Sequence, residues 1–219
     1  MVERVGKFIV FEGLDGCGKS TQLEYLRERL YTLCRSAGTR KVFATCEPSD
    51  SVPGLVCRGV IKKTLTVHHE TEALLFAADR YEHITNVVLP QLRDGNHVLC
   101  DRFFLSNFAY QSAETDMNTI LQYNLASVNL LVPDVTIFID VSPEECERRR
   151  LAARVTEDKH EKLERAKIIR EGYFKAMELL KGYQKELLII DGAKDANQTF
   201  EALWNELTAR NIFPETELV

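Results

Sequence analysis

The chain has 219 residues, of which 45% are hydrophobic and 28% charged, and its formal net charge is −5. This composition is that of an ordinary globular protein of one domain, and its acidic balance provides no electrostatic footprint for nucleic acid. We find no apolar run of about 18 residues and no signal-peptide pattern, so we expect a cytoplasmic protein without membrane contact. The six cysteines show neither a CxxC pair nor zinc spacing, which favours buried thiols in a reducing compartment.

The first predicted elements are a strand at 7–12 and a helix at 19–37, joined by a glycine-rich loop. The loop reads GLDGCGKS, a complete Walker A motif in the strand–loop–helix setting that this motif requires. Its backbone N–H groups and the helix N-terminus attract phosphate, Lys19 reaches the β- and γ-phosphates, and Ser20 offers a hydroxyl to Mg²⁺. The loop therefore predicts binding of a nucleoside triphosphate such as ATP. The predicted ATP-binding residues of the loop are Gly13, Asp15, Gly16, Cys17, Gly18, Lys19, Ser20 and Thr21.

Short apolar runs alternate with helical patterns along the rest of the chain. The further predicted strands are 41–45, 97–100, 135–140 and 187–190. The further predicted helices are 52–64, 70–93, 104–112, 117–130, 143–152, 159–184 and 195–210. Strands that are apolar almost throughout are typical of parallel strands buried on both faces. The pattern predicts one α/β domain over 1–219, a doubly wound five-stranded parallel sheet flanked by helices, with ligands at the carboxyl ends of the strands.

Asp101 and Arg102 follow the predicted strand at 97–100. A carboxylate at a strand tip beside a phosphate loop is suited to hold Mg²⁺ together with Ser20, and the adjacent arginine can grip a second phosphate. An ordinary loop ion pair is the alternative interpretation of these two residues. The chain lacks the NKxD and DxxG motifs of small GTPases, which argues against a signalling switch.

The segment 144–170 is dense in charge. For 161–170 the interleaved acids and bases favour a solvated helix with ion pairs between neighbouring turns. Arg148 to Arg154 lie where one helical pattern ends and another begins, so this part is either a solvated helix end or a basic connector that closes over the phosphates as a lid.

Several motifs in the same order resemble the thymidylate kinase (dTMP kinase) family, and the resemblance covers nearly all of the chain. The matching segments are FIVFEGLDGCGKSTQ at 8–22, LFAADR at 75–80, DRF at 101–103 and SNFAYQ at 106–111. The resemblance implies the fold of P-loop nucleoside monophosphate kinases, the reaction ATP + dTMP → ADP + dTDP in dTTP biosynthesis, Mg²⁺ as cofactor, and a homodimer.

The resemblance also implies an acceptor region over about 46–93. Phe76 would stack on thymine, Arg80 would donate to its O4, and these two residues share a helix face by their spacing. Asp15 would accept from the deoxyribose 3′-hydroxyl, and Arg102 would hold the acceptor phosphate. The implied dTMP-binding residues are Asp15, Glu47, Pro48, Arg58, Phe76, Arg80, Arg102, Asn107, Tyr110, Gln111, Asp158 and Glu161.

Residues 154–161 resemble the bacterial lid pattern RxxxDxxE, within a lid of about 148–160. The family places a catalytic arginine either in the phosphate loop or in the lid, and Gly16 with an arginine-rich lid is similar to the lid type. The implied catalytic residues are Lys19, Asp101, Arg102, Arg149, Arg150 and Arg154. Ala193 and Lys194 resemble the loop that contacts adenine.

Two positions depart from the family pattern. Phe103 replaces a tyrosine and loses its hydroxyl, and Cys46 stands where many bacterial members carry arginine. Arg58 is the candidate replacement for that arginine. The alternative functions are another deoxynucleoside or nucleotide kinase, and a P-loop protein that binds nucleotide without phosphotransfer.

Overall fold

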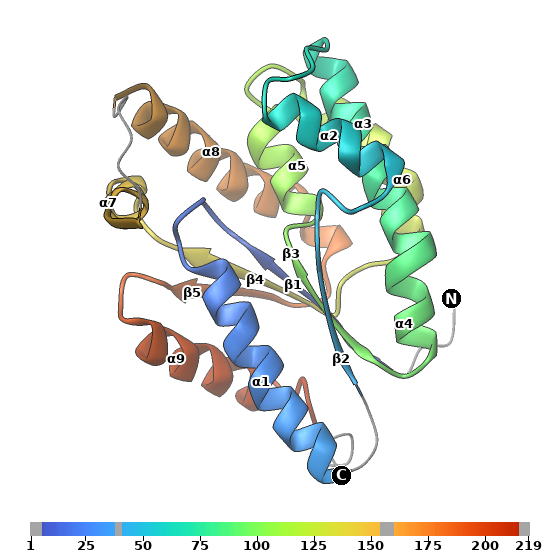
Figure 1. The fold of residues 1–219 in the computed structure, drawn as a ribbon, viewed down its shortest axis with the longest axis vertical. Coiled ribbons are helices and arrows are strands. Elements are labelled where there is room, and N and C mark those ends of the chain that lie inside the picture. The colour runs from blue at the N-terminus through green and yellow to red at the C-terminus, as the bar shows by residue number, and fades with distance from the viewer. Residues whose placement is uncertain (1–5, 38–40, 154–159, 215–219) are drawn as a thin grey trace.

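The protein is a three-layer α/β structure with one parallel sheet (Figure 1). The computed structural model describes residues 6–37, 41–153 and 160–214. The strands are β1 (Phe8–Glu12), β2 (Val42–Cys46), β3 (His97–Asp101), β4 (Val135–Asp140) and β5 (Leu187–Asp191). The α-helices are α1 (Lys19–Ala37), α2 (Val52–Ile61), α3 (His69–His83), α4 (Leu89–Arg93), α5 (Phe104–Gln111), α6 (Met117–Leu130), α7 (Pro143–Ala153), α8 (His160–Leu179) and α9 (Ala196–Ala209).

The five strands pair in parallel in the order β2-β3-β1-β4-β5. This confirms the predicted fold, and the reason is visible in β1, β3 and β4, whose apolar runs are buried on both faces. In Figure 1, α1 and α9 lie on one face of the sheet, and α5, α6 and α8 lie on the other. Within the described ranges, no helix is long and apolar enough to cross a bilayer, and none of the six cysteines forms a disulfide.

The register brings three strand ends to one edge of the sheet. Phe11 of β1 and Cys46 of β2 both align with Asp101 of β3. The loop after β1, the Glu47 segment after β2 and Arg102 after β3 therefore begin side by side. Strands β2 and β3 lie on one side of β1, and β4 and β5 lie on the other. The carboxyl edge at such a change in strand order is the usual ligand position in doubly wound folds.

The helix predicted over 70–93 is interrupted. α3 ends at His83, a π-helical turn spans Ile84–Val88, and α4 follows. Pro90 in the first turn of α4 has no N–H to donate, and its ring would clash with the carbonyl of the preceding turn of a regular helix. The wider π-turn removes that conflict. Similarly, the helix predicted over 159–184 ends at Leu179 and is followed by a 3₁₀ turn at Lys181–Tyr183.

Candidate active site

The phosphate loop depends on glycines in conformations that L side chains rarely adopt. Gly13, Gly16 and Gly18 have φ values of 143°, 90° and 98°. Lys19 begins α1 and is buried, and its Nζ donates to the Leu14 carbonyl oxygen at 3.0 Å. The loop is thus folded around its own lysine, and the contact of Lys19 with the β- and γ-phosphates stays a prediction.

Gly16 lies directly against α7. A Cβ added at Gly16 would stand 2.6 Å from the Cys146 carbonyl oxygen and 3.0 Å from Arg150 Cγ. No side chain fits at position 16 without moving α7, and the stem of Arg150 occupies the adjacent space. Arg150, which belongs to the predicted lid, therefore occupies the space that a basic side chain at position 16 would need.

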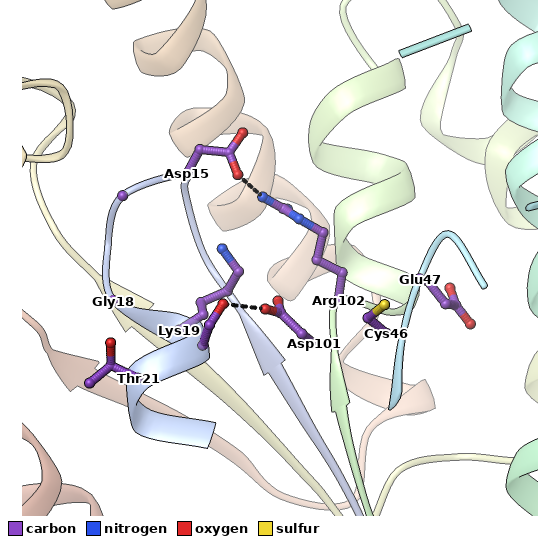
Figure 2. A pocket seen from close by; sticks show the side chains of 10 residues that line it. Asp15, Gly18, Lys19, Thr21, Cys46, Glu47, Asp101 and Arg102 are labelled. Carbon is purple, nitrogen blue, oxygen red and sulfur yellow. Dashed lines mark hydrogen bonds and ion pairs between the residues drawn. The ribbon is translucent and has the colours of Figure 1, made fainter. Parts of the chain in front are cut away.

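Ser20 and Asp101 meet at the carboxyl edge of the sheet. Ser20 Oγ donates to Asp101 Oδ2 at 2.8 Å (Figure 2). Asp101 Oδ1 is buried and has no hydrogen-bond partner among the described residues. A hydroxyl and a carboxylate are hard oxygen ligands, and Mg²⁺ binds through one or two such groups while it keeps waters and phosphate oxygens. The two residues therefore fit a magnesium ion.

Arg102 is held at both ends of its guanidinium group. Nη2 donates to Asp15 Oδ1 at 2.7 Å and to the Tyr110 hydroxyl at 2.9 Å. Nη1 donates to Ser106 Oγ and to the Tyr173 hydroxyl, both at 3.0 Å. Burial would lower the pKa of Arg102, but Tyr110, Tyr173 and Asp15 hold it well above its usual value. The side chain is a permanent cation that points at the phosphate loop (Figure 2).

Asp15 carries the opposite charge at the rim of the same site. Burial would raise the pKa of its carboxyl, but the positive charges of Arg102, Lys19 and Arg150 lower it. Its side chain remains 66% exposed. Asp15 is therefore an ionised acceptor that a ligand can reach.

Glu12 ends β1 close to Arg102. The sequence motif includes this residue but does not indicate a function for it. Its Oε1 accepts from the backbone N–H groups of Phe103 and Ser106, and its Oε2 accepts from the hydroxyls of Ser106 and Tyr173. Burial raises the pKa of this carboxyl, although the Ser106 hydrogen bond and the charge of Arg102 oppose the shift. A carboxylate that ends an otherwise apolar strand is the signal by which Glu12 could have been found. Tyr173 has no comparable signal.

Arg80 and Glu47 form a buried ion pair within the predicted acceptor region. Arg80 is 1% exposed, and its Nη2 donates to Glu47 Oε2 at 2.7 Å and to the Phe103 carbonyl oxygen at 2.9 Å. His83 Nδ1 lies 3.2 Å from Glu47 Oε1, and its Nε2 lies 2.8 Å from Thr45 Oγ1. The carboxylate is thus fixed from two sides, and sequence reasoning had not assigned His83.

Buried amides complete the surroundings of Arg80. Nη1 donates to Asn124 Oδ1 at 2.6 Å and to Asn107 Oδ1 at 3.2 Å. Asn107 also donates to Gln111 Oε1 at 3.2 Å. Both Nη atoms of Arg80 therefore contact protein groups, and its contact with thymine O4 stays a prediction. Phe76 is half-buried and does not line the cavity, so its stacking on thymine also stays a prediction.

Arg58 forms hydrogen bonds and an ion pair with the segment that follows β2. It donates from Nη2 to the Pro48 carbonyl oxygen and from Nη1 to the Ser49 carbonyl oxygen, both at 2.7 Å, and it pairs with Asp50 at 3.0 Å. Cys46, not Arg58, lines the cavity. A direct contact between Arg58 and dTMP stays a prediction, and the contacts present are those of a residue that shapes the loop at 48–50.

Arg149 of α7 connects two loops that are predicted to bind ATP. Its Nη1 donates to the Cys17 carbonyl oxygen at 3.4 Å and its Nη2 to the Ala193 carbonyl oxygen at 3.2 Å. The phosphate loop and the predicted adenine loop, which also contains the exposed Lys194, are thereby tied together. Arg154 and Asp158 lie outside the described residues, as does the side chain of Glu161.

One cavity of about 380 Å³ connects the two sides. It is lined by Asp15, Gly16, Gly18, Lys19, Ser20, Thr21, Cys46, Glu47, Asp101 and Arg102 (Figure 2). A Walker A loop and the half-buried Arg102 share this space, within a sheet of the order found here. Fold and site together define a P-loop nucleotide kinase of the nucleoside monophosphate kinase type.

Comparison with known proteins narrows the class. The family model described as Thymidylate kinase matches residues 11–203. A probable thymidylate kinase of Pyrococcus horikoshii is 40% identical and covers 80% of this chain and 84% of its own length. Thymidylate kinases of Thermoanaerobacter sp. and Desulforudis audaxviator are each 34% identical and cover 87% and 93% of this chain, and 91% of their own lengths. The chain belongs to the thymidylate kinase family.

Proposed function

We propose that this protein transfers the γ-phosphoryl group of ATP to dTMP, with release of ADP and dTDP. The observation that carries the proposal is the cavity in which Lys19 and Arg102 stand together, with Asp15 paired to Arg102. Lys19 and the loop face the donor phosphates, and Arg102 provides the positive charge for the acceptor phosphate. Family membership supports dTMP as the acceptor.

The chemistry requires little from a general base. The second pKa of a phosphate monoester is about 6, so the acceptor is mostly a dianion at neutral pH. An oxygen of that dianion attacks the γ-phosphorus, and the bond to the bridging oxygen of ADP breaks. The protein must therefore offset the repulsion between two polyanions, which is the task of Lys19, Arg102 and the arginines of the lid.

Ser20 and Asp101 would hold Mg²⁺, which supplies positive charge at the β- and γ-phosphates when it is bound. Asp101 contributes the carboxylate oxygen that has no partner among the described residues, and Ser20 contributes a hydroxyl already oriented toward that carboxylate. Ser20 and Asp101 are the two residues that would hold this ion beside Lys19.

We propose that residues 148–160 form the lid of a single domain over 1–219, and that 46–93 form its acceptor region. Arg149 and Arg150 already adjoin the phosphate loop, through the Cys17 carbonyl and beside Gly16. Arg154 is the candidate for the arginine that contacts the transferred group, and closure of the lid would exclude water from the γ-phosphate.

The test is a coupled assay of ADP release over a panel of nucleoside monophosphates, with thymidine included. We expect dTMP to be the preferred acceptor and dTDP to be formed. Acceptance of thymidine with refusal of dTMP would instead identify a deoxynucleoside kinase. Nucleotide binding without dTDP from any acceptor would identify a non-catalytic P-loop protein.

We also propose that the protein works as a homodimer that pairs through α3. Leu74 and Tyr81 are 45% and 46% exposed, and with the exposed Ala78 they form one face of this helix. Sedimentation of the wild type and of Tyr81→Glu tests the proposal. A wild-type monomer at all concentrations would contradict it.

A further inference from the structure

Tyr173 of α8 reaches the centre of the site although it does not line the cavity. Its side chain is completely buried, and its ring packs against Phe138 of β4 with 5.0 Å between ring centroids. From this position its hydroxyl contacts the end of β1, where the phosphate loop begins, and Arg102, which follows β3. α8 begins at His160, the last residue of the segment predicted to be the lid. Tyr173 therefore connects the helix that follows this segment to Arg102.

The contacts of this hydroxyl are directional. It accepts from Arg102 Nη1 at 3.0 Å, and its own proton faces Glu12 Oε2 at 3.2 Å and the Gly13 carbonyl oxygen at 3.3 Å. The Ser106 hydroxyl, 2.8 Å away, contacts the same Nη1 and donates to Glu12. A buried carboxylate thus holds two hydroxyls with their oxygens turned toward the guanidinium group.

The backbone conformation of Arg102 does not by itself fix the orientation of its side chain. Its φ is +69°, in the left-handed region that residues other than glycine seldom occupy. A conformation of this kind persists only where the surroundings determine it. The Arg102 N–H donates to the Phe11 carbonyl oxygen at 2.8 Å, which holds the backbone. The side chain is held by the contacts of Nη1 and Nη2, so loss of these contacts would let the side chain turn.

The two ends of the guanidinium group differ in what a ligand can displace. Nη1 faces Tyr173 and Ser106, which are buried or half-buried. Nη2 faces the half-buried Tyr110 and also Asp15, whose side chain is 66% exposed. An incoming phosphate can therefore exchange with Asp15 at Nη2 while Nη1 stays anchored. The contacts of Nη1 therefore determine the direction in which Nη2 points.

We propose that Tyr173 is a positioning residue, whose hydroxyl holds Arg102 in the orientation that receives the acceptor phosphate and ties this orientation to α8. The inference rests on the proposed function, because it takes Arg102 as the group that binds the phosphate of dTMP. It assigns to the hydroxyl, rather than to the ring, a role in acceptor affinity.

Tyr173→Phe tests this role, because it keeps the ring packing and removes only the hydroxyl. We expect the Kd for dTMP, measured by calorimetry, to rise roughly tenfold, since a buried hydrogen bond to a charged group is lost. The Kd for thymidine, which has no phosphate, and the KM for ATP should stay unchanged. The matched control is Tyr25→Phe, on α1, where the ring packs against Phe200 with 5.6 Å between centroids.

A second background separates positioning from general structure. In Arg102→Met, addition of Tyr173→Phe should not weaken dTMP binding further, because the group to be positioned is absent. Equal losses for dTMP and thymidine, an unchanged Kd for dTMP, a further loss in the Arg102→Met background, or a fall in Tm above about 10 °C would each overturn the proposal. Failure of the wild type to phosphorylate dTMP would instead overturn the proposed function.

Discussion

Arg80 of α3 and Arg148 of α7 are held in opposite ways. Arg80 and its partner Glu47 have side chains only 2% and 3% exposed, and their hydrogen bonds reach groups from several elements. Arg148 is 71% exposed and pairs with Glu145 one turn away on the same helix. The charge of Arg80 is part of the core, whereas the charge of Arg148 belongs to a local surface pair.

This difference has an energetic consequence. Removal of one partner from a buried ion pair leaves an uncompensated charge and costs about 3–5 kcal/mol, whereas an exposed pair contributes about 0–1 kcal/mol. Arg80 therefore cannot easily change partners. Arg148 can exchange its glutamate for a phosphate at little cost, which is what the proposed lid would require in order to close on ATP.

The largest effect is expected at Arg154, if catalytic charge indeed comes from the lid. Arg154→Ala should lower kcat by about 10³–10⁵, as for the loss of an arginine that contacts the transferred phosphoryl group. The measurement is ADP release at saturating ATP and dTMP, with Arg154→Lys to separate charge from bidentate geometry. A loss below about tenfold would transfer the role to Arg149 or Arg150.

The second test compares the two regions by stability. Arg80→Met should lower the free energy of unfolding by about 3–5 kcal/mol, because Glu47 stays buried without its cation. Arg148→Ala is the exposed counterpart and should change it by less than about 1 kcal/mol. Urea denaturation of both variants measures the difference. Similar losses in the two variants would remove the contrast between a buried and a surface set of arginines.

Sequence reasoning predicted the architecture well because the relevant information is local. The glycines of the phosphate loop, the apolar strands and Asp101 at a strand tip are read from short segments, and the structure agrees with the fold that they imply. The helix over 70–93 was predicted as continuous. Its π-turn depends on how the chain resolves the conflict at Pro90, which helical periodicity does not reveal.

Side-chain partners were less predictable than positions. The contact of Tyr173 with Arg102 spans 71 residues of sequence, and a buried tyrosine in an amphipathic helix has the same pattern as an ordinary core residue. Arg58 is a candidate dTMP contact by sequence, and its partners in the structure include the Pro48 and Ser49 carbonyls. Backbone acceptors carry no residue-type signature, so no pattern could have indicated them.

A moderate effect is expected at Arg149, which belongs to α7 but reaches the donor loops. Arg149→Ala should raise the KM for ATP by about tenfold, because the Cys17 and Ala193 carbonyls lose their common donor. Tm and the KM for dTMP should be unchanged, since the pair with Glu145 lies on a single helix. A rise in the KM for dTMP of the same size would contradict a division of the site into donor-side and acceptor-side arginines.

The smallest expected effect concerns pH. Hydrogen bonds from Arg148 and Arg149 lower the pKa of Glu145 to about 2. Glu145 is thus ionised well below its ordinary range, and its pairing is lost only as the pH falls toward about 2. The acid limb of kcat/KM for dTMP should instead lie near pH 6, where the acceptor phosphate takes up a proton. Glu145→Gln should leave this limb in place over a profile from about pH 5 to about pH 8. A displaced limb would mean that ionisation on α7 controls the reaction, and the surface pairs would then not be freely exchangeable.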